Sequence, residues 1–282
     1  MINVITSRDN KIIKEIKQLD QKKFRDQLGS FLIEGQTLIS EALDHGALIK
    51  SIVYCEALWP STDGLPAKDN QPSLNRLELL LNRLEKSDVP IFKVDQKLFN
   101  QLTDTITPQG ILGVVCKKEM VAENFFAENK EGNIMVLDRL QDPGNLGSIL
   151  RTADAAGFQG IILLKGSSDI YSAKVVRATA GSIFRVPVLF TDTAEETIAL
   201  LRANNKTIFC TGPKADQVYF DAKLAKNAAI VIGNEAKGIS DSFMRNCDSQ
   251  ISIPMSGTIE SMNAAACAAI LMYEAVRQNL NQ

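Results

Sequence analysis

The stretch Ile134-Met-Val-Leu-Asp-Arg-Leu-Gln-Asp-Pro-Gly-Asn-Leu-Gly-Ser-Ile-Leu-Arg-Thr-Ala153 decides the fold class of this chain. It begins with an apolar run, passes through a polar turn that contains Pro143 and Gly144, and continues as a helix from about Asn145. A continuously apolar strand is typical of a parallel sheet that helices cover on both faces. The stretch therefore predicts the strand, turn and helix of an α/β domain.

The same pattern recurs along the rest of the chain. Apolar runs alternate with helical segments and predict further strands at residues 160–164, 186–190, 207–210, 228–232 and 251–253. Most of these runs are nearly continuously apolar, so the strands are expected to be parallel and buried on both faces. Residues 133–282 are therefore expected to form one α/β domain.

A smaller α/β module is expected ahead of it, over residues 1–116. Apolar periodicity and turn residues predict helices and strands in alternation, with helices at 9–27, 36–45 and 73–86 and strands at 30–34, 48–54, 89–94 and 110–116. Three prolines and an Asp-Gly pair predict an exposed loop over 59–72. Residues 117–132 lack a strand pattern and are expected to link the two domains, as a connecting helix or as a flexible segment.

Composition bounds the class of protein. At roughly one domain per 150 residues, a chain of 282 residues is expected to hold two domains. With 45% hydrophobic and 23% charged residues, it is expected to be globular. The sequence holds no apolar run long enough for a membrane span and opens without the pattern of a signal peptide, so a cytoplasmic location is expected. The five cysteines never form a Cys-x-x-Cys pair, which favours buried thiols over disulfides or a zinc site.

Charge is distributed unevenly. The chain has a net charge of −2, yet residues 1–25 contain seven basic and three acidic residues. This segment is either the solvated face of a helix that buries Ile12, Ile16 and Leu19, or a surface that contacts nucleic acid. Both interpretations stay open on charge alone.

Polar, glycine-rich segments follow four of the predicted strands. In open parallel sheets, ligands bind at the carboxyl ends of the strands, so these segments are expected to form one site. They cover residues 138–153, 211–213, 233–238 and 254–263. Gly144 and Gly147 do not satisfy G-x-G-x-x-G, which disfavours a nicotinamide or Rossmann-type site.

Three of these segments, in this order, resemble the motifs of the SpoU family of the SPOUT superfamily, RNA ribose 2′-O-methyltransferases that use S-adenosylmethionine. The matching stretches are residues 142–153, 232–240 and 253–263. The third departs from the usual Ser-Leu-Asn-Val-Ser, because this chain has Ser261-Met-Asn-Ala-Ala265. The N-terminal module is similar, through scattered residues at 7–11, 31–35 and 109–110, to a substrate-binding domain related to ribosomal protein L30e.

The resemblance implies a fold, a partner and a substrate. The fold would be α/β, with a C-terminal SPOUT domain whose parallel sheet carries a deep trefoil knot, preceded by a small L30e-like α/β domain. The enzyme would form a homodimer through the C-terminal domain, including part of a predicted helix at about 263–278. Its substrate would be RNA, with ribosomal RNA favoured over transfer RNA.

The resemblance also assigns residues. Backbone groups and apolar side chains would bind S-adenosylmethionine, from Thr211, Ile232, Gly233, Gly238, Ile253, Met255 and Met262. The reaction would use polar side chains of all three motifs, namely Asn145, Arg151, Glu235, Ser261 and Asn263. No metal is expected, since Glu235 and Glu260 lack an accompanying aspartate cluster.

The family assigns proton removal to Arg151, with Glu235 orienting its guanidinium. Physical chemistry favours another role, because a guanidinium with a pKa above about 12 is a poor base and a carboxylate partner stabilises its cation further. We therefore expect Arg151 to donate to the reacting hydroxyl or its adjacent phosphate, with the base drawn from solvent or substrate.

Two other classes of function compete with this hypothesis. A non-catalytic RNA-binding or assembly protein could keep the fold, but it would gain nothing obvious from Asn145, Arg151 and Glu235 beside a cofactor pocket. A different nucleotide-using α/β enzyme is disfavoured by the missing phosphate loop.

Overall fold

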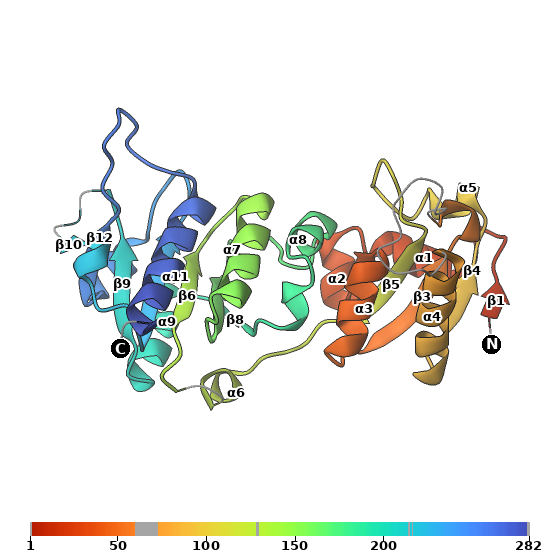
Figure 1. Cartoon of the computed structure of the whole chain (residues 1–282), viewed down its shortest axis with the longest axis horizontal. Coiled ribbons are helices and arrows are strands. Elements are labelled where there is room, and N and C mark those ends of the chain that lie inside the picture. Colours follow the sequence, from red (N-terminus) through yellow and green to blue (C-terminus); the bar gives the residue numbers. More distant parts are fainter. Residues whose placement is uncertain (1, 60–72, 128–129, 214, 216, 281–282) are drawn as a thin grey trace. The chain divides into compact units, whose positions relative to one another are not determined.

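The structure, a computed structural model, describes residues 2–59, 73–127, 130–213, 215 and 217–280 (Figure 1). The chain divides into two compact units. Unit 1 is Met1–Lys118 with Tyr171–Phe184, and unit 2 is Glu119–Ile170 with Arg185–Gln282. The division at Lys118 falls inside the segment predicted as a linker. Of the predicted loop at 59–72, only Trp59 lies within the described residues.

Unit 1 is built on a mixed five-stranded sheet of order β1-β4-β3-β5-β2. Its strands are β1 (Ile2–Val4), β2 (Ser30–Glu34), β3 (Ile49–Tyr54), β4 (Ile91–Lys93) and β5 (Ile111–Cys116). The strand β5 runs antiparallel to β2 and β3, and the other pairings are parallel. The helical elements are α1 (Lys11–Gln18), α2 (Lys22–Leu28), α3 (Gln36–Asp44), η1 (Glu56–Leu58), α4 (Ser73–Lys86), α5 (Gln96–Phe99), α8 (Ala173–Ala178) and η2 (Ser182–Phe184).

Both faces of this sheet are buried. Ile52 packs into one core cluster with Ile39 of α3, and its neighbour Val53 packs into a second cluster with Ile13 of α1. Successive side chains of a strand point to opposite faces, so this alternation gives the module a helix layer on each side. The predicted small α/β module is confirmed, although the exposed edge strand β1 was not predicted.

The predicted helix over 9–27 is wrong in one respect, because two helices, α1 and α2, occupy the region. The buried guanidinium of Arg25 in α2 donates to the carbonyl oxygens of Leu19 and Asp20, at 2.7 and 2.6 Å. These bonds satisfy carbonyl groups that the end of α1 leaves unpaired, and they favour a break between the helices. Ile13 is completely buried, whereas Ile12 is only partly buried.

Unit 2 contains a seven-stranded sheet of order β10-β12-β9-β11-β6-β7-β8, in which every pairing is parallel. Its strands are β6 (Ile134–Asp138), β7 (Gly160–Leu164), β8 (Val188–Thr191), β9 (Thr207–Thr211), β10 (Gln217–Val218), β11 (Ala228–Gly233) and β12 (Ser249–Ser252). The parallel sheet is confirmed. The strand β10, which has two residues that are both partly exposed, was not predicted.

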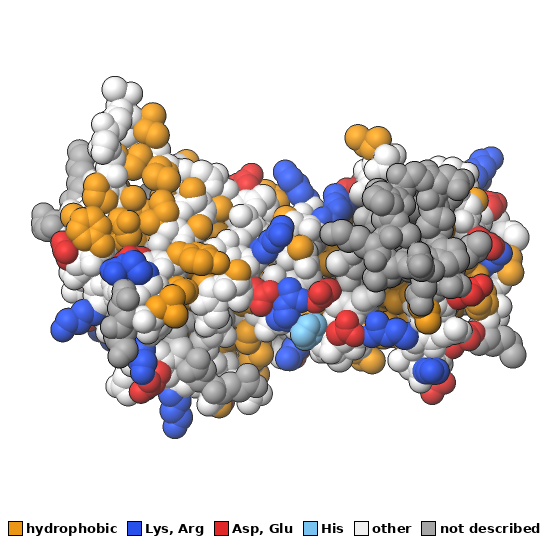
Figure 2. Space-filling view, in the orientation of Figure 1, with side chains coloured by type: hydrophobic (Ala, Val, Ile, Leu, Met, Phe, Trp, Pro, Cys, Tyr) orange, Lys and Arg blue, Asp and Glu red, His pale blue; other side chains and the backbone are white. Residues whose placement is uncertain are grey.

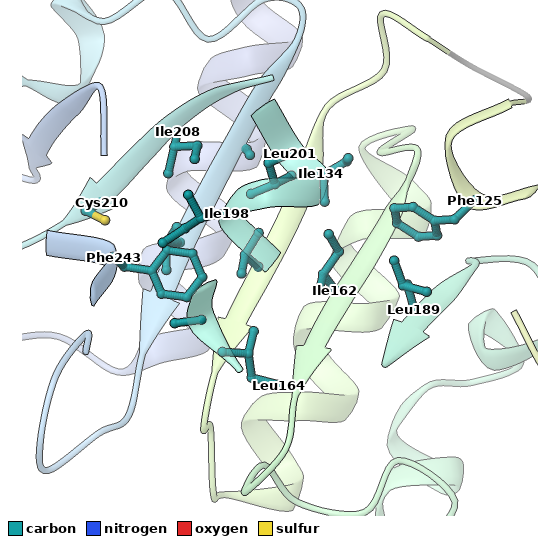
Figure 3. Close-up of a cluster of buried hydrophobic side chains, with 14 of the residues drawn as sticks. Phe125, Ile134, Ile162, Leu164, Leu189, Ile198, Leu201, Ile208, Cys210 and Phe243 are labelled. Atoms are coloured by element: carbon teal, nitrogen blue, oxygen red, sulfur yellow. The ribbon is translucent and has the colours of Figure 1, made fainter. Parts of the chain in front are cut away.

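Helices cover both faces of this sheet. They are α6 (Ala122–Ala127), α7 (Pro143–Ala155), α9 (Ala194–Ala203), η3 (Tyr219–Asp221), α10 (Asp241–Asn246) and α11 (Ala264–Leu280). One face packs against α9 and α10 through residues such as Ile198 and Phe243 (Figure 3), and α7 and α11 pack together and against strands of the sheet. Part of the predicted linker is helical, because α6 buries Phe125 and Phe126 in this core.

The cysteines differ in burial. Cys55 and Cys210 are buried, as predicted, but Cys116, Cys247 and Cys267 are partly exposed. Within the described ranges, no helix has both the length and the apolar character to cross a membrane.

Candidate active site at the strand ends of unit 2

A cavity of about 530 Å³ opens at the carboxyl ends of β9, β11 and β12. All seven predicted cofactor residues line it, namely Thr211, Ile232, Gly233, Gly238, Ile253, Met255 and Met262. Four of the five predicted catalytic residues line it too, and these are Asn145, Glu235, Ser261 and Asn263. The structure thus brings residues of all three motifs to one cavity.

A chain of hydrogen bonds joins the three motifs. The amide nitrogen of Asn145 donates to Glu235 Oε1 at 3.0 Å, and the amide nitrogen of Asn263 donates to Asn145 Oδ1 at 2.8 Å. Asn145 is buried, with 8% of its surface exposed. Its amide is therefore held from both sides in one orientation.

Local sequence explains why Asn145 lies there. Asp142 caps the first turn of α7, accepting from the backbone N–H of Asn145 at 2.7 Å, and Pro143 occupies the first position of the helix. Both residue types are favoured at these positions of a helix. The cap thus fixes Asn145 in the first turn, directly after β6.

Glu235 binds the same turn from the other side. Its carboxylate accepts from the backbone N–H groups of Gln141 and Asp142, both at 3.1 Å, as well as from Asn145. Burial disfavours the charged form of Glu235, but the hydrogen bonds from the Asn145 side chain and from the backbone outweigh it and lower the pKa of this carboxyl. The ionised Glu235 carboxylate therefore holds the turn before α7 and the first turn of that helix together.

The turn that carries Glu235 is shaped by Asn234 and two glycines. The Asn234 side chain accepts from the N–H groups of Ala236 and Lys237 and donates to the carbonyl of Arg139 at 2.9 Å. A Cβ atom on Gly233 would lie 2.4 Å from backbone atoms of Gly238 and Ile239, so only glycine fits there. The sequence interpretation did not single out Asn234, although an Asn after a strand-end glycine is a signal of such a turn.

The end of β6 also contacts the second motif. Asp138, fully buried at the end of β6, accepts from the backbone N–H of Ser240 at 2.6 Å and from Arg139 Nε at 2.7 Å. The hydrogen bond to Asp138 raises the pKa of Arg139, whose backbone has a positive φ of 60°. Asp138 thus connects the end of β6 to the end of the second motif.

The third motif ends in a helix cap. Asn263 Oδ1 accepts from the N–H groups of Ala265 and Ala266, at 2.9 and 3.2 Å, at the start of α11. Because only the oxygen of the Asn263 side-chain amide is used in this cap, its nitrogen can donate to Asn145. Ser261 is exposed on the cavity wall, and Cys267, whose thiol has a pKa raised by burial, lies one turn into α11.

Arg151 is the exception among the predicted residues. It is exposed on α7, it does not line the cavity, and it has no hydrogen bond or ion pair with any residue that the structure describes. The resemblance implied that Glu235 orients the Arg151 guanidinium, but in the described part of the chain the two side chains are not bonded to each other. No group of three or more His, Cys, Asp and Glu side chains in the described ranges could hold a metal ion.

Comparisons with known proteins identify the family of the chain. Residues 132–273 match the SpoU rRNA Methylase family, and residues 10–113 match the MRM3-like substrate binding domain. The chain is 30% identical to the 23S rRNA (guanosine(2553)-2'-O)-methyltransferase RlmP of Bacillus subtilis, over 95% of this chain and 97% of that protein. It is 31% identical to the 23S rRNA (guanosine-2'-O-)-methyltransferase RlmB of Escherichia coli, over 72% of this chain and 85% of that protein.

A solved structure supports the same assignment. The AdoMet-bound rRNA methyltransferase from Sinorhizobium meliloti has 31% identity and a TM-score of 0.85, with 98% of both chains covered. With a family match over half of its length and full-length relatives at this identity, the chain belongs to the SpoU rRNA methylase family.

Proposed function

We propose that this protein is an S-adenosylmethionine-dependent RNA 2′-O-ribose methyltransferase that acts on ribosomal RNA. The observation that carries the proposal is the linkage of Glu235, Asn145 and Asn263 across three motifs at one cavity. Relatives named as 23S rRNA 2′-O-methyltransferases align over most of the chain, which favours ribosomal RNA over transfer RNA.

The cavity suits S-adenosylmethionine. Its volume of about 530 Å³ falls within the ~300–1,000 Å³ of small-molecule sites. Its wall combines apolar side chains such as Ile232 and Met255 with the backbone of the Gly233 turn, as an adenosine ring and a polar amino-acid end require. When bound, the cofactor supplies an electrophilic methyl group. The chain's own task is to hold the ribose hydroxyl in line with that group, which is mainly a task of positioning.

Arg151 is assigned the role of hydrogen-bond donor to the reacting hydroxyl or its adjacent phosphate, and the proton of that hydroxyl passes to a base drawn from solvent or substrate. Its exposure supports this role, and so does the absence of a hydrogen bond or ion pair to any described residue, because its N–H groups are then open to a substrate oxygen. The residue that Glu235 positions is Asn145 and not Arg151. Ser261 and Asn263 line the part of the cavity where cofactor and substrate would meet.

The two domains divide the work. Residues 1–116 bind RNA, and residues 133–282 bind the cofactor and catalyse transfer. The segment 117–132 connects them and adds α6 to the core of unit 2. The match to a substrate-binding domain over residues 10–113 supports this division. So does the exposed basic surface of α1 and α2, formed by Lys11, Lys14, Lys17, Lys22 and Lys23.

We further propose a homodimer formed through unit 2, a trefoil knot in its chain path, and a cytoplasmic location beside the ribosomal substrate. Figure 2 displays hydrophobic side chains over the part of unit 2 that holds α11 and β12. Phe220, Tyr273 and Leu280 are large hydrophobic residues of this unit that stay at least half exposed. A monomeric mass by light scattering at micromolar concentration, with full activity, would contradict the dimer.

The test combines binding with mapping of the product. Calorimetry should detect S-adenosylmethionine binding, and cells lacking the protein should lose one 2′-O-methyl group in ribosomal RNA. Loss of a transfer RNA methyl group instead would move the substrate to the alternative class. RNA binding without cofactor binding or methylation would favour a non-catalytic assembly protein.

A further inference from the structure

The segment Tyr171–Phe184 belongs to unit 1, although the chain on both sides of it belongs to unit 2. Within unit 1, the Tyr171 ring lies 4.9 Å from the Phe31 ring, and Val176 is buried in the core. Arg177 donates two hydrogen bonds to Asp104, at 2.7 and 3.3 Å. The segment is thus fastened to the unit that we assign to RNA binding.

Three residues before Tyr171, Ser168 is fastened to the active site of unit 2. Its backbone N–H donates to the carbonyl of Leu140 at 2.8 Å, and its hydroxyl donates to the carbonyl of Gln141. The N–H of the same Gln141 donates to Glu235. Ser168 and Glu235 therefore hold Gln141 from its two peptide groups.

Only Asp169 and Ile170 separate Ser168 from the anchored Tyr171, and Ile170 is buried, with 1% of its surface exposed. Ser168 and Tyr171 are therefore close along the chain although they belong to different units. From Ser168, hydrogen bonds lead through the Gln141 backbone to Glu235 and on to Asn145.

We infer that Ser168 is a positioning residue that couples the RNA-binding unit to the Glu235–Asn145–Asn263 cluster through the Gln141 backbone. The inference rests on the proposed function and adds to it a route by which RNA held by unit 1 sets the geometry of methyl transfer. Ser168 itself touches neither substrate nor cofactor in this scheme.

The test compares Ser168→Ala with the matched control Ser167→Ala. The Ser167 hydroxyl makes only a 3.5 Å contact with the carbonyl of Leu137, so its loss should change little. Ser168→Ala should slow single-turnover methylation about tenfold, as expected for losing one well-placed hydrogen bond. Affinities for RNA and for S-adenosylmethionine should stay within about twofold, because the binding surfaces are intact.

Two further readouts separate positioning from a merely structural role. Hydrogen exchange at the amides of Gln141 and Asp142 should accelerate in Ser168→Ala and not in Ser167→Ala, because these amides donate to Glu235. Ser168→Thr, which keeps the hydroxyl, should restore both the rate and the protection. Tyr171→Ala should also slow methyl transfer. In the Ser168→Ala background, the same substitution should reduce the rate by a smaller factor than it does in the unmodified protein.

Equal rates for the Ser168→Ala and Ser167→Ala enzymes would overturn the inference, and so would unchanged amide exchange or additive effects of Ser168→Ala and Tyr171→Ala. These outcomes are distinct from failure of the proposed function, in which the unmodified protein would not methylate RNA. If Ser168→Ala did not fold, full rates and protection in Ser168→Thr together with slow transfer in Tyr171→Ala would support the inference, and a normal rate in Tyr171→Ala would refute it.

Discussion

Two glutamates, Glu34 in unit 1 and Glu235 in unit 2, follow the same local design with different consequences. Glu34, at the end of β2, accepts hydrogen bonds from the hydroxyls of Thr103 and Thr105 and from the N–H of Gln109. Glu235 also collects three donors from a neighbouring turn. Both carboxylates therefore fix a loop by gathering its donors.

The difference lies in what the donors connect. All partners of Glu34 belong to one loop, and the adjoining cavity, of about 180 Å³, is bordered by the ion-paired Arg177 and Asp104. The Asn145 partner of Glu235 passes the connection to Asn263, 118 residues along the chain, at a cavity of about 530 Å³. The hydrogen bonds of Glu34 thus end at one loop, whereas those of Glu235 continue through Asn145 to a third segment at the cavity of the motif residues.

The largest effect is expected for Arg151→Ala. Because Arg151 lies outside the hydrogen-bonded cluster, this variant tests whether the cluster alone carries the reaction. If Arg151 contacts the transition state, methylation should fall by at least ~100-fold while cofactor affinity changes only a few-fold. Single-turnover assays with calorimetry measure both quantities. Near-normal turnover would remove Arg151 from the reaction and leave the cluster as the whole catalytic apparatus.

Glu235→Gln is expected to have the next largest effect. The amide presents an N–H₂ group where the carboxylate accepts hydrogen bonds, so the Gln141 and Asp142 amides lose an anionic acceptor. Methylation should fall by ~10- to 30-fold, equivalent to about 1.4–2 kcal/mol, while the melting temperature at neutral pH falls only modestly, through loss of the stabilising carboxylate. A large loss of stability at unchanged activity would instead make Glu235 resemble Glu34.

The same carboxyl gives a pH dependence of stability. Because the pKa of Glu235 in the folded protein lies below the ordinary value of 4.5, its ionisation stabilises the folded state above that pH. This stabilisation should be lost as the pH falls through the lower folded pKa. Urea titrations of the unmodified protein and of Glu235→Gln should therefore converge in acid, and curves that stay parallel down to pH 3 would contradict the shift.

Replacing Lys11, Lys14, Lys22 and Lys23 with alanine tests whether unit 1 binds RNA by charge. Lys14 and Lys22 already pair with Asp9 and Asp26, but exposed pairs of this kind are weak and phosphate can displace them. RNA affinity should drop about tenfold, and its dependence on salt should decrease by ~0.7–0.9 per lost contact. S-adenosylmethionine binding should not change. Wild-type RNA affinity with an unaltered salt slope would leave this surface as a solvated helix face.

The smallest expected effect belongs to Glu34→Gln. Weakening the bonds from Thr103 and Thr105 should destabilise unit 1 by about 1 kcal/mol. Turnover at saturating RNA should stay within about twofold. Calorimetric melting and steady-state kinetics measure the two quantities, and a turnover loss as large as that of Glu235→Gln would erase the distinction between the glutamates.

Sequence patterns predicted the parallel sheet and the segments that form the cavity, because both leave local signals, whereas the individual cavity residues came from the family resemblance. Buried strands are continuously apolar, as at residues 134–137, and polar segments follow the strand ends. The edge strands β1 and β10 escaped prediction because they are short and have no buried side. The break between α1 and α2 escaped because it depends on the side chain of Arg25 contacting the preceding helix.

The arrangement inside the site could not be predicted in the same way. Motif resemblance named Asn145, Glu235 and Asn263 as a group, but their bonding order depends on side-chain directions set by the whole fold. The partner expected for Glu235 was Arg151, whereas the structure gives it the start of α7. The membership of Tyr171–Phe184 in unit 1 likewise depends on packing between segments remote in sequence.

The bond between Asn145 and Asn263 also has a consequence for synthesis on the ribosome. At ~5–20 residues per second, the 118 residues between them take roughly 6–24 s to translate, and Asn145 waits that long for its partner. The parallel sheet adds to the delay, because no strand of unit 2 pairs through a tight hairpin. A nascent chain can thus fold unit 1 and most of unit 2 before it can catalyse methyl transfer. The Glu235–Asn145–Asn263 cluster is complete only after Asn263, directly before α11, has been synthesised.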